Sequence, residues 1–311
     1  MAPHAQHPAI VIAGPTASGK SQVAMALAER LDGVIINADS MQVYRELAIL
    51  TARPSPTEAA RLPHALYGFV SGAEAYSAGR YANDAAAALA EARSRGRVPI
   101  IVGGTGLYFR ALLTGLSPIP AADPEVRSHW RQAAARLTPR ELHAHLTARD
   151  PVMAERLLPT DPQRIVRALE VLETTGRSLA DWQRQPGSPA PGLADARRLL
   201  LLPEATQHAA AIARRFEAML GDGALAEVSH LRALGLSGEL PIMRALGVAP
   251  LIAHLAGKID LEAAANAAKL ETRQYAKRQL TWFRRNMIAW RPVKMEEMQR
   301  SLREIFAFIE R

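Results

Sequence analysis

The stretch that decides the fold is Gly14-Pro15-Thr16-Ala17-Ser18-Gly19-Lys20-Ser21, which follows the apolar run Ala9-Ile10-Val11-Ile12-Ala13. Its spacing fits G-x-x-x-x-G-K-[ST], and a helical pattern over residues 23–31 comes after it. In that context the glycines let backbone N–H groups turn toward one anion, while Lys20 adds a positive charge. The Ser21 hydroxyl can hold Mg²⁺ at the start of the helix. We therefore predict that residues 14–21, called the phosphate loop below, bind the phosphates of a ligand.

The composition describes a globular chain rich in helix. At 311 residues it is long enough for one large domain with an insertion, or for two modest domains. Hydrophobic residues make up 49% of the chain and aromatic residues only 5%, which favours a helical globule over a disordered chain. The absence of cysteine excludes disulfides, thiolate catalysis and cysteine-ligated zinc, and it fits a reducing cytosol.

The sequence shows no sign of export or of membrane insertion. Its first eight residues lack the charged region of a signal peptide, and no apolar run reaches the length of a membrane span. We therefore expect a cytoplasmic protein with no membrane partner, and we expect it to be a monomer.

Positive charge is concentrated near the C-terminus. The formal net charge is +8, and residues 269–311 hold eleven Lys and Arg against five Glu. Between Arg273 and Arg285 there are five basic residues and no acidic one. Alone, such a run favours a solvated helix face. Combined with a phosphate-binding loop, it favours a polyanionic partner such as a nucleic acid.

Three apolar segments are typical of buried parallel strands: Ile10–Ala13, Val34–Ala38 and Val98–Val102. They end at the phosphate loop, at Asp39-Ser40 and at Gly103-Gly104-Thr105-Gly106, and helical patterns such as residues 84–93 separate them. Residues 198–203 add a further strand, and residues 207–234 a helical stretch. The alternation predicts an α/β fold, a P-loop NTPase-like parallel sheet flanked by helices. Because ligands bind at the carboxyl ends of such strands, the three turns should line one crevice.

Residues 121–192 instead predict an insertion made only of helices. Three helix starts are marked by an N-cap residue followed by proline: Asp123-Pro124, Thr138-Pro139 with Glu141 completing a capping box, and Asp161-Pro162. The block closes in a loop rich in proline and glycine at residues 185–192. We therefore assign residues 1–120 and 193–311 to the core.

Two turn residues are candidates for chemistry. Asp39 follows an apolar strand, where its carboxylate can act as a base or Mg²⁺ ligand, or can equally cap the next helix. In the glycine turn, Thr105 either places a hydroxyl beside a substrate or accompanies a close approach of two backbones.

Basic side chains also recur at helical spacing. Arg164 and Arg167 lie near a helix start, where the helix dipole disfavours cations, and this slightly favours an external anion. Near the C-terminus, one helix stripe is polar and basic and another is apolar, so the basic face is free to meet phosphates. The polar stripe is Arg273, Lys277, Thr281 and Arg284, and the apolar one is Ala276, Leu280, Phe283 and Met287. Trp282 lies between them and is predicted to pack.

Taken together, five segments closely resemble the bacterial tRNA dimethylallyltransferase family: residues 14–21, 39–45, 103–108, 163–170 and 277–282. Their order and spacing match over nearly the whole chain. The resemblance implies transfer of a dimethylallyl group from dimethylallyl diphosphate to the exocyclic amine of the adenine immediately 3′ of a tRNA anticodon. Mg²⁺ would assist, and pyrophosphate would leave.

The resemblance also implies roles for individual residues. Asp39 would be the general base, Thr105 would hydrogen-bond nearby, and Arg215 would add a second cation at the pyrophosphate. The adenine would flip out of the anticodon loop. Its pocket would be lined by Ser40, Met41 and Gln42.

By the same resemblance, the helical insertion and the basic C-terminal helix would bind the anticodon stem-loop of the tRNA. Asp39 and Thr105 would meet the tRNA as well. The remaining contacts would be Arg127, Gln163, Arg164, Ile165, Val166, Arg167, Lys277, Arg278, Gln279, Thr281 and Arg284. Residues 248–250 depart from the family pattern and receive no role.

Three other functions compete with this one. An adenylate isopentenyltransferase would use the same donor but a free nucleotide as acceptor, and the tRNA-facing segments argue against it. A P-loop small-molecule kinase would leave the insertion and the basic tail unexplained. A nucleic-acid-binding module with an inactive phosphate loop conflicts with intact Lys20, Ser21 and Asp39. The sequence leaves open which tRNAs would be modified.

Overall fold

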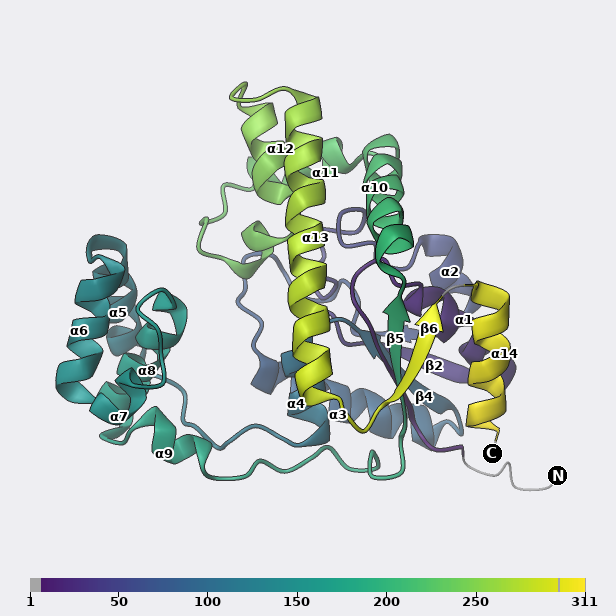
Figure 1. Ribbon diagram of the computed structural model, residues 1–311, viewed down its shortest axis with the longest axis horizontal. Coiled ribbons are helices and arrows are strands. Elements are labelled where there is room, and N and C mark those ends of the chain that lie inside the picture. The colour runs from purple at the N-terminus through teal and green to yellow at the C-terminus, as the bar shows by residue number, and fades with distance from the viewer. Residues whose placement is uncertain (1–6, 296, 311) are drawn as a thin grey trace. The chain divides into compact units, whose positions relative to one another are not determined.

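The computed structural model describes residues 7–295 and 297–310 (Figure 1). The chain divides into two compact units: a sheet unit, which runs up to Leu113 and resumes at Ala190, and a helical unit, Thr114–Pro189. The helical unit begins seven residues before, and ends three residues before, the 121–192 segment that we assigned to an insertion. No helix in the described ranges combines the length and the apolar character that a membrane span requires.

Within the described residues, six parallel strands form one sheet in the order β3-β2-β4-β1-β5-β6. Their bounds are β1 (Ile10–Ala13), β2 (Gly33–Asn37), β3 (His64–Ala65), β4 (Val98–Gly103), β5 (Arg197–Pro203) and β6 (Arg291–Met295). β1, β2 and β4 are buried along their whole length, because helices cover both faces of the sheet. The predicted α/β class and the four predicted strands are confirmed, while β3 and β6 are additional edge strands.

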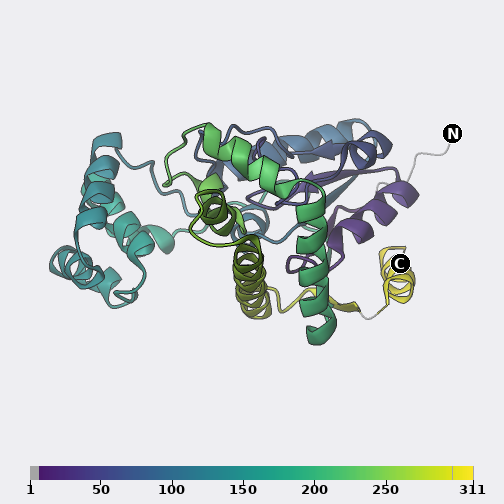
Figure 2. The ribbon, with the colours of Figure 1, turned by 90° about the horizontal axis from the view of Figure 1, so that it is seen from above.

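Helices of the sheet unit complete two apolar cores, one on each face of the sheet. Side chains alternate along a strand, so Ile10 and Ile12 of β1 join the core under α1 and α14, whereas Val11 joins the core under α3, α4 and α13. In both views α10 and α13 run side by side (Figures 1 and 2). The bounds are α1 (Lys20–Leu31), α2 (Pro56–Arg61), α3 (Ala78–Ser94), α4 (Gly106–Leu113), α10 (Ala205–Gly221), α11 (Ala224–Ala233), the 3₁₀ helix η1 (Pro241–Arg244), α12 (Val248–Leu255), α13 (Leu261–Asn286) and α14 (Met298–Ile309).

The stretch 207–234, predicted to be helical, contains two helices rather than one. α10 ends at Gly221, and α11 starts after Gly223, whose φ of 103° no continuous helix accommodates. The packing role predicted for Trp282 is confirmed, because a Cβ on Gly106 would lie 2.5 Å from its ring. This close approach fixes α13 against the start of α4.

The helical unit has a core of its own. Its helices are α5 (Pro124–Arg136), α6 (Pro139–Arg149), α7 (Pro151–Ala154), α8 (Pro162–Thr175) and α9 (Leu179–Gln183). Trp130 and Ile165 are buried at its centre. The three predicted helix starts are confirmed: side chains of Asp123, Thr138 and Asp161 accept hydrogen bonds from backbone N–H groups of the first turns.

Candidate active site

The phosphate loop joins β1 to α1 through two residues with positive φ. Ala17 has φ 58°, and Gly19, just before α1, has φ 80°. Left-handed residues in such a loop turn successive N–H groups toward one side. Gly14 has no room for a side chain, because a Cβ there would lie 2.7 Å from Ser18 Oγ. Ser18 Oγ is buried without a hydrogen-bond partner in the described part of the chain, so it suits a ligand oxygen.

A cavity of about 520 Å³ opens beside the phosphate loop. Lys20 and Ser21 line it from the loop. Facing side chains come from the segments after β2 and around β3 and from α10, namely Gln42, Arg53, His64, Tyr67, Arg214 and Arg215. The cavity therefore places three arginines beside a loop whose N–H groups and lysine already favour an anion.

Two of the cations are within electrostatic reach of Asp39. Burial lowers the pKa of Lys20 to about 8, while Asp39 raises it and Arg215 lowers it. Burial also lowers the pKa of Arg215, and Asp39 again acts in the opposite direction. Lys20 Nζ donates to the carbonyl of Pro15 in its own loop (3.0 Å). A bound anion would favour the charged form of both side chains.

Asp39 follows β2, and Asn37 holds its backbone from both sides. The N–H of Asp39 donates to Asn37 Oδ1 (2.8 Å), and Asn37 Nδ2 donates to the carbonyl of Asp39 (2.9 Å). Asp39 Oδ1 accepts from the N–H of Met41 (2.9 Å), which closes a turn. The helix-capping alternative is wrong, because the next helix begins only at Pro56. Among the described residues no hydrogen bond reaches Oδ2, which is left to accept a proton.

The turn after β4 is joined directly to the turn after β2. Thr105 Oγ1 accepts from the N–H of Ser40 (2.9 Å), and the N–H of Thr105 donates to the carbonyl of Ala38 (3.2 Å). A Cβ on Gly103 would lie 2.1 Å from that carbonyl oxygen. Both predictions for this turn are therefore compatible: the two backbones approach closely, and the approach sets a hydroxyl beside the Asp39 turn.

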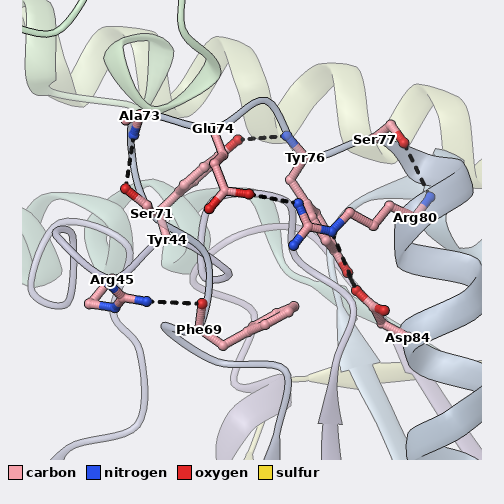
Figure 3. Close-up of polar contacts among 10 residues, drawn as sticks. All are labelled: Tyr44, Arg45, Phe69, Ser71, Ala73, Glu74, Tyr76, Ser77, Arg80 and Asp84. Carbon is pink, nitrogen blue, oxygen red and sulfur yellow. Dashed lines mark hydrogen bonds and ion pairs between the residues drawn. The ribbon is translucent and has the colours of Figure 1, made fainter.

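A network of polar side chains braces the segment that follows Asp39 (Figure 3). The hydroxyl of Tyr44 accepts from the N–H of Tyr76 (3.4 Å), and the hydroxyl of Tyr76 donates to Asp84 of α3 (2.7 Å). Arg80 pairs with Glu74 (2.9 Å) and lies over the ring of Tyr76. The loop after β3 thus ties the Asp39 segment to α3.

The structure corrects the prediction that the side chain of Gln279 on α13 contacts tRNA. Its side chain is only 6% exposed, because position 279 lies on the buried side of α13. Its Oε1 accepts from the N–H of Thr16 (2.9 Å), and its Nε2 donates to the carbonyl of Gly104 (2.8 Å). Gln279 therefore links the phosphate loop to the glycine turn. His208 of α10 also bonds to Thr16, through the carbonyl (2.8 Å).

The residues predicted for an adenine pocket, Ser40, Met41 and Gln42, are each half-buried beside Asp39. Gln42 Nε2 is already used, because it donates to the carbonyls of Thr51 and Ala52. Gln42 is also a lining residue of the cavity beside the phosphate loop.

The basic face of α13 is exposed as predicted. Lys277, Arg278, Thr281 and Arg284 all face solvent. The guanidinium of Arg278 lies over the ring of Tyr275, at 5.6 Å from its centroid. Buried Gln279 and exposed Lys277 and Arg278 thus share one rigid helix.

In the helical unit, one predicted contact is wrong for its side chain. Ile165 is 0% exposed, since α8 turns it into the apolar core. Its neighbours on α8 remain at the surface to different degrees: Gln163 and Arg164 are exposed, and Val166 and Arg167 are half-buried. Arg164 pairs with Asp161 (3.4 Å) and Arg167 with Glu170 (3.5 Å). Arg127 of α5 is exposed.

No group of three or more His, Asp or Glu side chains in residues 7–295 and 297–310 is arranged to hold a metal ion. Asn37 and His208, together with the inward role of Gln279, escaped sequence reasoning. Of these three residues, only Asn37 has a mark in the sequence, because it is a polar residue at the end of an apolar strand.

Two family models match the chain. One, described as IPP transferase, covers residues 42–286, and another, described as isopentenyl transferase, covers residues 8–65. The chain is 50% identical over 302 residues to a tRNA dimethylallyltransferase of Parvibaculum lavamentivorans, with 97% of this chain and 96% of that protein covered.

Solved structures are similar as well. The full-length tRNA isopentenylpyrophosphate transferase from Bacillus halodurans has a TM-score of 0.70 and 32% identity, over 98% of this chain and 96% of the other. A eukaryotic dimethylallyltransferase acting on tRNA has a TM-score of 0.81 and 27% identity, over 98% of this chain and 80% of the other.

Proposed function

Because the chain belongs to the IPP transferase family, we propose that it transfers a dimethylallyl group from dimethylallyl diphosphate to tRNA. The acceptor is the exocyclic amine of the adenine immediately 3′ of the anticodon. The observation that carries the assignment of roles is that Lys20 and Arg215 line one cavity beside the phosphate loop, with Asp39 close enough to favour the charged form of both. A leaving diphosphate and a proton acceptor thereby have places at one site.

The phosphate loop, Lys20 and Arg215 bind the diphosphate. Its oxygens meet backbone N–H groups of residues 17–21, the side chain of Lys20 and, across the cavity, Arg215. The orphaned hydroxyl of Ser18 offers a further hydrogen bond. As the allylic C–O bond breaks, negative charge grows on the diphosphate. The fixed N–H groups and cations stabilise this charge more than they stabilise the intact dimethylallyl diphosphate.

The loop also fits Mg²⁺ together with a diphosphate. Ser21 is exposed at the start of α1, where its hydroxyl would be one ligand of the ion and diphosphate oxygens would supply others. When bound, the ion neutralises charge on the leaving group.

The acceptor amine is activated by Asp39. With the adenine flipped out of its loop, the amine nitrogen forms the new bond to the allylic carbon and loses a proton to Asp39 Oδ2. Asn37 and the Met41 N–H hold the carboxylate in place. Thr105, fixed against Ser40, adds a hydroxyl for orientation.

The exposed face of α13 binds the phosphates of the anticodon stem-loop. Arg127, Gln163, Arg164 and Arg167 of the helical unit are proposed as further contacts, whereas Ile165 and Gln279 act from inside the protein. The helical unit is in this proposal a tRNA-binding module inserted into the catalytic core.

Replacing Lys277 and Arg278 together by alanine is expected to weaken tRNA binding and flatten its salt dependence. The loss of two phosphate contacts reduces the slope of log K against log salt by about 1 to 2. Binding measured over a salt series checks this. The matched control removes the same two charges elsewhere, at exposed Arg95 and Lys258. An unchanged slope in the Lys277 and Arg278 variant would return this stripe to a merely solvated face.

The function is tested with purified protein, Mg²⁺ and labelled dimethylallyl diphosphate, offered unmodified tRNA or AMP separately. We expect label in tRNA alone. Label in AMP alone would assign the chain to the free-nucleotide enzymes. Label in neither, with ATP consumed in a screen of metabolites, would favour a small-molecule kinase.

A further inference from the structure

Thr16, in the middle of the phosphate loop, is held by its backbone from two helices. Its N–H donates to Gln279 of α13 (2.9 Å), and its carbonyl bonds to His208 Nε2 of α10 (2.8 Å). A carbonyl oxygen only accepts, so Nε2 must carry the hydrogen, as it does both in one neutral tautomer and in the charged ring. His208 is 7% exposed, and neither the sequence motifs nor the proposed mechanism uses it.

The next residue in the loop has an unfavourable backbone conformation. Ala17 has φ 58°, in the left-handed region that a residue with a Cβ rarely adopts. Such a conformation persists only where the surroundings hold it, and it is typical of functional sites. Here the surroundings are the two bonds to Thr16 on one side and the start of α1 on the other.

We propose that His208 is a positioning residue for the diphosphate, holding the Thr16 carbonyl so that the loop keeps its left-handed turn at Ala17. This left-handed turn orients the N–H groups of the loop toward the ligand. Positions 208, 212 and 215 share one face of α10, so the helix that brings Arg215 to the cavity also fixes the loop. The inference deepens the proposed function and rests on it for the identity of the ligand.

The test is equilibrium binding of inorganic pyrophosphate with Mg²⁺, measured by calorimetry, which needs no transfer activity. In His208→Leu, the leucine fills the space of the imidazole ring but supplies no N–H to the Thr16 carbonyl. We expect the pyrophosphate affinity of this variant to fall about tenfold or more, while its tRNA affinity stays as in the parent. His208→Gln places an amide N–H near the position of Nε2 and should recover most of the affinity. The control is Gln207→Ala, an exposed neighbour on the same helix.

A second variant separates the turn from general packing. If His208 acts through the left-handed residue, Ala17→Gly in the His208→Leu background should restore part of the lost affinity, since glycine adopts positive φ without a penalty. Parent-like affinity of His208→Leu, or no recovery in the double variant, would overturn the proposal. Should His208→Leu not fold, His208→Ala, which also lacks a donor at this position, and its Ala17→Gly derivative replace it under the same criteria. A parent protein that binds pyrophosphate but prenylates no acceptor would refute the proposed function and leave this inference standing.

Discussion

Replacing Asp39 by asparagine is expected to lower kcat about 10²- to 10⁴-fold, the range that removal of a general base produces. Asparagine keeps an Oδ1 that accepts from the N–H of Met41, so the turn that carries the side chain should persist. What is lost is the proton acceptor at the second oxygen. The KM values for both substrates should therefore stay near those of the parent, because the interaction exists only in the transition state.

Single-turnover transfer to tRNA, with tRNA binding measured separately, checks the Asp39 prediction. Glu91→Gln is the control, since Glu91 lies exposed on α3 in a surface ion pair with Arg95. A fall in tRNA affinity that matches the fall in rate would instead make Asp39 a binding residue. Unchanged turnover would remove it from the mechanism.

The parts of this site that the sequence predicted are those in which local pattern and chemistry coincide. The phosphate loop combines a motif, a preceding apolar strand and a following helix, and Asp39 stands where a strand must end. The helix starts in the insertion follow the same logic, because caps such as Asp123 act within one turn. Local rules thus located the loop and one carboxylate without any knowledge of packing.

The contacts that hold these groups were beyond local reasoning. Gln279 lies 263 positions from Thr16, and His208 lies 192 positions from it, so no periodicity connects them. Gln279 was predicted to contact the tRNA because it lies in a segment that resembles the family, together with Lys277 and Arg278, yet one turn of a helix contains both an exposed and a buried side. β6 escaped for another reason: Arg291 and Pro292 at its start are exposed, as an edge strand allows.

Replacing Lys20 by methionine is expected to lower kcat/KM for dimethylallyl diphosphate about 10²- to 10³-fold, as for the loss of one preorganised donor at a developing anion. Arg215 remains to face the same ligand from α10. Methionine fills a similar volume, so the change removes charge while the apolar contacts of the stem are largely kept. Steady-state kinetics over a range of donor concentrations measures the loss, and unchanged kinetics would contradict a role for Lys20 in donor binding.

We also expect Lys20 to give donor binding a pH dependence. Burial depresses its pKa to about 8, so its charge is present below that pH and is lost as the pH rises through it. The affinity for an unreactive dimethylallyl diphosphate analogue should therefore be full below pH 8 and fall by up to about tenfold per pH unit above it. Lys20→Arg is the discriminating variant, because a guanidinium keeps its charge throughout this range and should give a flat profile. If the arginine variant showed the same decline, the titrating group would be another residue, and the phosphate loop would bind its ligand without the help of this proton.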